Sequence, residues 1–137
     1  MSWKEKMKEW APANLLFLSS DGVVARFIVV GEPELVTTMY QRTEQERIAC
    51  PVFNDDGFQL FVINKRTARK LASIEEHFGT DVITVTRHGA EGDTNTVYEV
   101  GHVGDKRQVK AWQEAWSKID QEEAIREAHG SLTEVMK

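Results

Sequence analysis

The sequence predicts a mainly β domain with helices: a small OB-type β-barrel with one helix between its third and fourth strands and a further helix at the C-terminus. Three observations predict it. Short β-branched and aromatic runs separated by turn residues fill the first half, a helical period replaces them at 65–78, and two strand-like runs follow before a long helical stripe. We divide the chain into an amphipathic helix (1–13), the barrel (14–104) and a C-terminal helix with its tail (105–137).

The first elements are a short helix and a hairpin. Trp3, Met7 and Trp10 recur at helical spacing and end near Pro12, which predicts an amphipathic helix lying on the core. The segments 14–20 and 23–30 are rich in β-branched residues and flank the turn dipeptide Asp21-Gly22. We expect them to pair as two strands of a hairpin.

The next predicted strands are interrupted by segments that contain glycine and proline. Gly31-Glu32-Pro33 interrupts the pattern, and a strand-like alternation resumes at 35–42. The segment 46–53 is a weaker strand that contains Pro51, so we expect it to be an edge strand or to be kinked there. The run 54–57, Asn-Asp-Asp-Gly, is a strong turn signal, and 58–64 is the clearest strand of the chain.

Helical periodicity appears twice. At 65–78 apolar residues recur every three to four positions, with Asn64 as the expected N-cap and Gly79 as the stop. The segments 81–87 and 96–100 then predict two strands joined by a flexible loop. A single long helix is expected over 107–128, ended by His129-Gly130.

The composition excludes several classes of protein. With 137 residues, of which 41% are apolar, the chain can form one self-sufficient core. Its single cysteine excludes an intramolecular disulfide framework, and the N-terminal segment has no apolar region for secretion. No run reaches the roughly 18–20 apolar residues of a membrane span. We therefore expect a cytoplasmic protein without a membrane partner, whose net charge of −5 confines any nucleic-acid site to a local strip.

The central part of the sequence resembles a known family. The features are Gly31-Glu32-Pro33, the apolar strand FVI at 61–63, the helix RTARKL at 66–71, and VTRHG at 85–89 followed by Asp93-Thr94 and Tyr98. In these it resembles single-stranded DNA-binding proteins encoded by bacteriophages. The resemblance implies an OB fold and a protein that protects single-stranded intermediates of DNA replication and recombination in the bacterial host cell. The terminal helices lie outside it.

Single-strand binders combine cations, which contact phosphates, with aromatic faces, on which bases stack. Phe58 and Phe61 are expected to belong to the core, whereas packing and base stacking are equally open for the other strand aromatics. Arg87, which precedes the 88–95 loop, and the cations at the start of the 65–78 helix have an alternative interpretation. In it they are ordinary exposed residues that do not contact DNA. The predicted DNA-binding residues are Tyr40, Arg42, Phe53, Lys65, Arg66, Arg69, Arg87, His88 and Tyr98.

The stripe of Trp112 and Trp116 on the C-terminal helix has two interpretations. The indoles either pack back on the barrel or bind a partner, which would be a second copy of the chain or a replication or recombination protein. With the acidic net charge, the second interpretation suggests an alternative function. In that alternative the chain is a protein-interaction or regulatory module that acts on a host or phage protein.

An enzyme is not expected. The sequence contains no G-x-S-x-G, Walker A or H-E-x-x-H signature. The four histidines, His77, His88, His102 and His129, lie at no metal-ligand spacing, and one cysteine cannot form a zinc site alone. We therefore expect neither a cofactor nor a bound metal, and we interpret Cys50 as a small buried residue.

Overall fold

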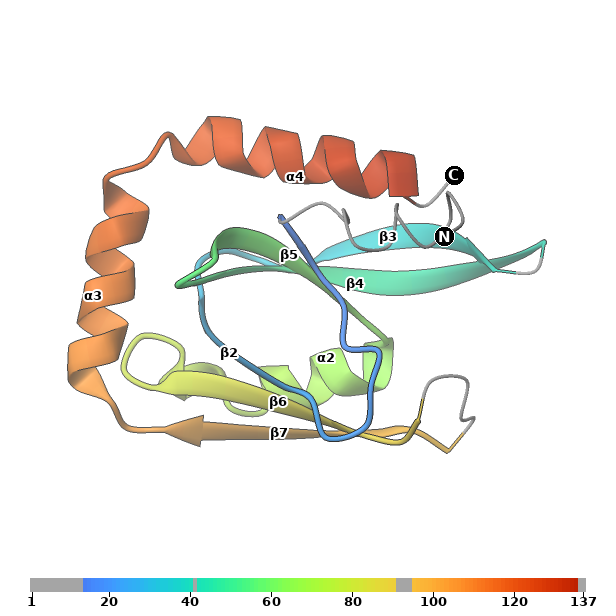
Figure 1. Ribbon diagram of the computed structural model, residues 1–137, viewed down its shortest axis with the longest axis horizontal. Coiled ribbons are helices and arrows are strands. Elements are labelled where there is room, and N and C mark those ends of the chain that lie inside the picture. Colours follow the sequence, from blue (N-terminus) through green and yellow to red (C-terminus); the bar gives the residue numbers. More distant parts are fainter. Residues whose placement is uncertain (1–13, 41, 91–94, 136–137) are drawn as a thin grey trace, which may run out of the picture.

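In the computed structural model, which describes residues 14–40, 42–90 and 95–135, seven strands form one mostly antiparallel sheet (Figure 1). The strand order is β1-β5-β4-β2-β6-β7, and β3 pairs with another part of β4. Within these residues β7 pairs with β6 alone, so the sheet is open where we expected a barrel to close. The elements are β1 (Leu15–Leu16), β2 (Val24–Val29), β3 (Glu34–Tyr40), β4 (Thr43–Asn54), β5 (Gly57–Ile63), α2 (Lys65–Ala72), the 3-10 helix η1 (Glu75–His77), β6 (Val82–His88), β7 (Val97–Val103), α3 (Lys106–Ser117) and α4 (Gln121–Val135).

Strand β2 connects two layers of the sheet. Its residues 24–27 pair with β6, whereas Ile28 and Val29 pair with β4. In Figure 1 the strands β3, β4 and β5 form one layer, β6 and β7 form the other, and β2 passes from one to the other. Helix α2 joins the two layers in sequence, since it follows β5 and precedes β6.

The β4–β5 hairpin confirms the turn predicted at 54–57. Asn54 pairs with Gly57, which has a φ of 92°, a value that glycine adopts without strain. The Asn54 side chain accepts a hydrogen bond from the backbone N–H of Asp56 (2.9 Å). This local chemistry fixes the register of the two strands.

Pro51 does not lie on an edge strand, because β4 is paired on both sides. Its carbonyl accepts a hydrogen bond from Val30 N–H (3.0 Å), so its missing N–H faces the same side of β4. There the pairing with β3 ends at Ala49 and the pairing with β2 begins at Val52. Proline is tolerated at this position because the ladder changes partner and needs no donor.

The hairpin expected from segments 14–20 and 23–30 is wrong. Leu15 and Leu16 form the short strand β1, which pairs in parallel with Leu60 and Phe61 of β5. The turn at Asp21-Gly22 exists, with Gly22 at a φ of 80°, but the chain after it pairs with β6. Long-range pairing therefore overrides the local hairpin signal.

The central helix is shorter than predicted. Asn64 caps it as expected, since its side chain accepts a hydrogen bond from Thr67 N–H (2.7 Å). Helix α2 ends at Ala72, and a separate 3-10 turn follows before Gly79. Ser73 closes α2 by donating its backbone N–H to Arg69 O (3.1 Å) and its hydroxyl to Lys70 O (2.6 Å).

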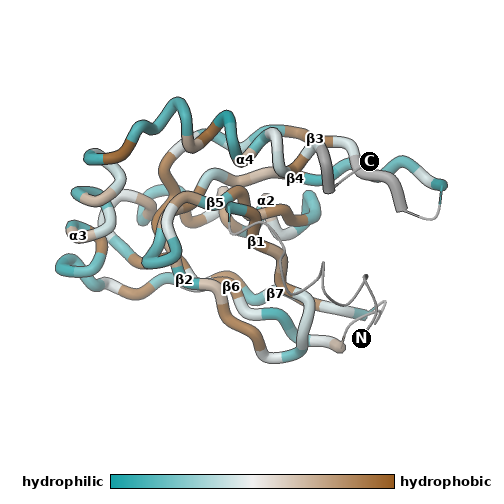
Figure 2. Tube along the Cα trace, turned by 45° about the horizontal axis from the view of Figure 1, so that its top comes forward, coloured by the Kyte–Doolittle hydropathy of each residue, from teal (hydrophilic) through white to brown (hydrophobic). Residues whose placement is uncertain are grey.

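Two groups of buried side chains hold the structure together, and Figure 2 shows apolar segments running through the middle of the molecule. The inner core lies between the layers and beneath α2, and it includes Phe27, Cys50, Val52, Phe61, Ile63, Leu71, Ile83 and Val85. The outer core lies between the β4–β5 face and the C-terminal helices, and it includes Ile28, Ala49, Phe53, Phe58, Leu60, Trp112, Ala128 and Leu132. Because β5 contributes to both cores, its sequence is almost continuously apolar.

The long C-terminal helix predicted over 107–128 is two helices. Asp105 caps α3 by accepting a hydrogen bond from Gln108 N–H (3.1 Å), and α3 ends at Ser117. Asp120 begins α4 by accepting one from Glu123 N–H (3.1 Å), and α4 continues through Gly130, which we expected to end it. The break lets α4 turn back over the β3–β4–β5 layer (Figure 1).

The amphipathic helix predicted at 1–13 lies outside the described residues. Within the described ranges, no helix has the length and apolar character needed to cross a membrane.

Candidate nucleic-acid interface

Helix α2 presents most of the predicted cations on its solvent side. Thr67 and Leu71 are buried, which turns Lys65, Arg66 and Arg69 outward. Lys65 and Arg66 are in the first turn, where cations oppose the macrodipole and do not stabilise α2, whereas Arg69 is in the last turn, where a cation is favourable. This arrangement is consistent with a role toward an external anion.

The cations of α2 differ in their partners. The ammonium of Lys65 forms an ion pair with Glu46 on β4 (3.0 Å), and both side chains are about half exposed, so the pair contributes little stability. No described carboxylate lies within ion-pair distance of Arg66 or Arg69. These two guanidinium groups are the cations of α2 that remain available.

A chain of hydrogen bonds links α2 to the β6–β7 hairpin. Lys70 donates its ammonium to the backbone carbonyl of Tyr98 on β7 (2.8 Å), and the Tyr98 hydroxyl accepts a hydrogen bond from Arg87 on β6 (3.0 Å). The structure therefore brings the α2 cations, Arg87 and Tyr98 to one side of the molecule. The Tyr98 ring is partly buried against the inner core.

All N–H donors of the Arg87 side chain form hydrogen bonds within the chain. Besides Tyr98, it donates to the carbonyls of Leu18 (2.8 Å), Gly89 (3.0 Å) and Ala90 (3.0 Å) and to the hydroxyl of Thr96 (3.4 Å). A guanidinium has five N–H donors, and these five bonds occupy them. The prediction that Arg87 contacts phosphate is therefore corrected: Arg87 fixes both ends of the β6–β7 loop to the segment before β2.

His88 also has a partner. Its Nε2 lies 2.9 Å from a carboxylate oxygen of Glu99 on β7, and both side chains are exposed. The backbone N–H of the next residue, Gly89, donates to Asp21 (2.9 Å). The carboxylates of Glu99 and Asp21 thus lie near His88, and their negative charge disfavours the binding of a phosphate there.

Two predicted residues lie at the tip of the β3–β4 hairpin. Tyr40 pairs with Thr43 at the end of β3, but its side chain lies outside the described part of the structure. Arg42 is exposed and has a φ of 65°, in the left-handed region. The described ends of β3 and β4 at this hairpin and of β6 and β7 next to their connection lie on the same side of the molecule in Figure 1.

Phe53 is not available for base stacking, and this prediction is wrong. Its side chain is 5% exposed and packs in the outer core, with its ring centroid 5.7 Å from that of Trp116. Trp112 is also buried, and its indole N–H donates to Asp55 (2.8 Å). Trp112 is buried and Trp116 is partly buried, so both indoles pack on the sheet, as the first of the two interpretations expected; binding of a partner through the C-terminal helices stays a prediction.

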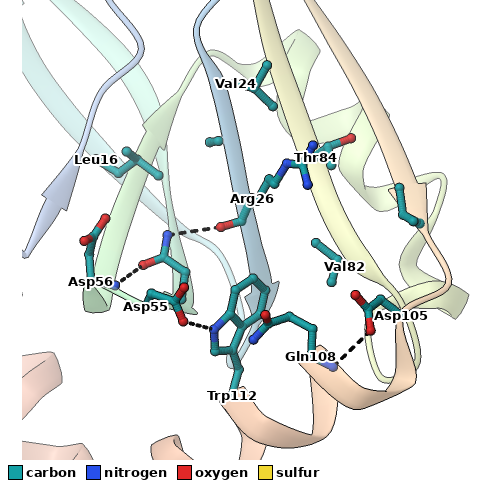
Figure 3. A pocket seen from close by; sticks show the side chains of 13 residues that line it. Leu16, Val24, Arg26, Asp55, Asp56, Val82, Thr84, Asp105, Gln108 and Trp112 are labelled. Atoms are coloured by element: carbon teal, nitrogen blue, oxygen red, sulfur yellow. Dashed lines mark hydrogen bonds between the residues drawn. The ribbon is translucent and has the colours of Figure 1, made fainter.

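A hollow lies between β2, β6, the β4–β5 turn and α3 (Figure 3). Its volume is about 460 Å³. Arg26 lies on its wall, but the carboxylates of Asp55, Asp56 and Asp105 also line it. Three carboxylates against one guanidinium make this pocket unsuited to phosphate.

Cys50 is buried in the inner core. Loss of hydration raises the pKa of its thiol to about 12, so the thiolate is scarce at neutral pH. A cysteine in this environment is unreactive, which agrees with its expected role as a small apolar residue.

One polar cluster was missed. His77, Asp81 and His102 meet at the end of the sheet next to α3, although spacing suggested no relation between the histidines. His102 Nδ1 lies 2.7 Å from Asp81 Oδ2, and this hydrogen bond, with one from Thr80, lowers the pKa of Asp81. The four-residue interval between His77 and Asp81 was a visible signal, but the arrival of His102 depends on the pairing of β6 with β7.

Comparison of the chain with protein-family models, curated proteins and solved structures finds no significant match.

Proposed function

We propose that the chain is an OB-type protein that binds single-stranded DNA with little sequence preference and protects such intermediates during phage replication or recombination. In this proposal it catalyses no reaction. The interface consists of α2, the β3–β4 hairpin near Arg42 and the ends of β6 and β7 that α2 contacts. Arg66 and Arg69 contact phosphates, with Arg42 and Tyr40 at the hairpin tip as further contacts.

The strand order supports the OB part of the proposal. An OB barrel has five strands in a Greek-key arrangement, and its ligands bind on a strand face and on two loops. In this chain β2, β4, β5, β6 and β7 follow one another with α2 between the third and the fourth, apart from the inserted β3. The first of these strands pairs with both the second and the fourth, as in a small barrel, while β5 and β7 are unpaired with each other in the described residues and the sheet stays open.

The observation that carries the DNA-binding proposal is the pair Arg66 and Arg69. Both are exposed and lack a described carboxylate partner, while the Lys70–Tyr98–Arg87 contacts hold their helix against the β6–β7 hairpin. Free guanidinium groups on a fixed scaffold are suited to a phosphate backbone. They also form a local site, as the net charge of −5 demands.

The direct test is fluorescence anisotropy with a labelled oligothymidylate over a range of salt concentrations. For single strands the logarithm of the affinity falls with the logarithm of salt by about 0.7 per phosphate contact. Replacing Arg66 and Arg69 together by alanine should therefore weaken binding and lower the slope by about 1.4. Absence of binding at micromolar protein in low salt contradicts the proposal.

The matched control is on α3. Arg107 and Lys110 are exposed, three residues apart, and Arg107 is the second residue of its helix, as Arg66 is of α2. The double alanine variant at 107 and 110 changes the net charge equally but lies on the other side of the molecule (Figure 1). Its slope should stay close to that of the unmodified protein. An equal loss in both variants would mean that overall charge, and no local interface, governs binding.

The alternative, an acidic protein-interaction module, predicts a different result. In this alternative the chain does not bind the oligonucleotide. Instead, it captures a protein from lysate, and the capture survives nuclease treatment. The burial of Trp112 and the packing of Trp116 on the sheet leave less exposed indole surface for a partner.

A further inference from the structure

Three metal-ligating side chains converge away from the proposed DNA interface. They come from three segments: His77 from η1, Asp81 from the residue before β6, and His102 from β7. One potential ligand atom from each lies within 4.8 Å of the other two. Both Nδ1 atoms face the same carboxylate oxygen, Asp81 Oδ2, at 3.5 Å from His77 and 2.7 Å from His102.

The backbone fixes these positions. Asp81 N–H donates to His77 O (2.9 Å), which closes the turn between η1 and β6. Ile83 pairs with His102, so the register between β6 and β7 determines where His102 lies along the sheet. The two imidazole rings stack with their centroids 3.8 Å apart and their planes 12° apart. Hydrogen-bonded backbone therefore holds the three residues close together, while the partly exposed imidazoles can still rotate.

The spacing is close to that of a tetrahedral site. With Zn–N and Zn–O distances of about 2.0–2.2 Å, neighbouring ligand atoms lie roughly 3.3 Å apart. The two measured separations, 2.7 and 3.5 Å, lie on either side of that value. Because the lone pair of an imidazole nitrogen lies in the plane of its ring, the two stacked rings must rotate out of their parallel arrangement before both can bind one ion.

Neighbouring groups orient the ligands as an outer shell does. Thr80 donates its hydroxyl to Asp81 Oδ1 (2.9 Å), which leaves Oδ2 for an ion. The far nitrogen of His77, Nε2, lies 3.4 Å from a carboxylate oxygen of Glu76. A carboxylate behind a ligating histidine fixes the ring orientation and raises the basicity of the other nitrogen.

We propose that His77, Asp81 and His102 bind a divalent transition-metal ion, with Zn²⁺ as the best fit. Two imidazoles and one carboxylate suit zinc, whereas Mg²⁺ and Ca²⁺ prefer oxygen ligands throughout. The partial exposure of both histidines leaves a fourth position for water. The bound ion ties η1 to β7 and so holds the two segments that flank β6.

The test is isothermal titration calorimetry of the untagged, chelator-treated protein with ZnCl₂, without DNA. We expect one zinc ion per chain. His102→Ala and Asp81→Asn should each weaken binding by at least about 100-fold, beyond the loss typical of an outer-shell residue. Circular dichroism of both variants checks that they remain folded. Co²⁺ should give the visible absorption bands of a tetrahedral site in the unmodified protein and lose them in the variants.

The matched control is His88→Ala. His88 lies on the same β6–β7 hairpin and also contacts a carboxylate, Glu99 at 2.9 Å, but it is outside the cluster. It should bind zinc as the unmodified protein does. The proposal is overturned if the unmodified protein takes up no zinc, if folded His102→Ala keeps its affinity, or if His88→Ala loses as much. None of these results depends on DNA binding.

Discussion

The indole of Trp116 stacks on the ring of Phe58, with the ring centroids 5.1 Å apart and the planes inclined by 18°. This contact holds α3, which ends one residue later at Ser117, against β5. Stacked aromatic pairs contribute about 0.5–1.5 kcal/mol beyond the area that they bury. The C-terminal helices are therefore part of the folded core.

Trp116→Ala should lower the free energy of unfolding by about 2–4 kcal/mol, because it removes the packing on both Phe53 and Phe58. Urea denaturation followed by circular dichroism measures the loss. Ile119→Ala is the control, since Ile119 is 40% exposed and its truncation should change stability by less than about 0.5 kcal/mol. Equal stability of the Trp116 variant and the unmodified protein would contradict the packing described.

Arg87→Lys separates a structural role from a phosphate contact. Lysine keeps the charge but cannot reproduce the five hydrogen bonds, so carbonyls such as Leu18 O lose their donor. We expect a loss of about 1–3 kcal/mol in unfolding experiments and an unchanged salt slope in the oligothymidylate titration. A lower slope with unchanged stability would instead assign Arg87 to the DNA.

Gly31→Ala should destabilise the fold, because a Cβ at this position would lie 2.9 Å from Cγ of Pro51. Overpacking of this kind costs about 1–3 kcal/mol. Gly79→Ala is the control, since its Cβ would meet no atom within 4 Å. Thermal unfolding should show a lower melting temperature for the first variant and little change for the second. The contact is refuted if the two variants melt together.

Cys50 should make stability fall in alkaline solution. Burial raises the pKa of its folded thiol from the ordinary 9.0 to about 12, so the unfolded chain loses this proton first as the pH rises. Its contribution is complete below about pH 9 and disappears toward pH 12. Between pH 8 and pH 10 the free energy of unfolding should drop by about 1 kcal/mol more than in Cys50→Ala.

The same burial predicts slow alkylation. At pH 8, iodoacetamide should modify Cys50 in urea but leave the native protein unmodified over the same period. Rapid labelling of the folded chain would show that the thiol is accessible.

Local signals predicted the elements that depend on neighbours in sequence. The turn at Asn54–Gly57, the apolar strand β5 and the Asn64 cap of α2 all follow from chemistry within a few residues. Pairings between distant segments did not follow. Leu15 and Leu16 pair with β5 instead of β2, and nothing local distinguishes these two choices.

In the candidate sites, too, local features could be predicted from the sequence and long-range contacts could not. The basic character of α2 was evident from its sequence, but the saturation of Arg87 was not, because its partners include Leu18, 69 residues away. The helix break at Asp120 carried a visible signal, since Glu follows three residues later as in a capping box. The apolar residues that recur at helical spacing over 107–128 suggested one continuous helix and so hid this signal.

Strand β2 belongs to both layers of the sheet, so neither layer can open without breaking its hydrogen bonds. The backbone amides of Phe27 and Ile28, whose side chains are at most 1% exposed, should therefore exchange with solvent deuterium only through global unfolding. The opening of this strand is therefore coupled to the unfolding of the whole sheet.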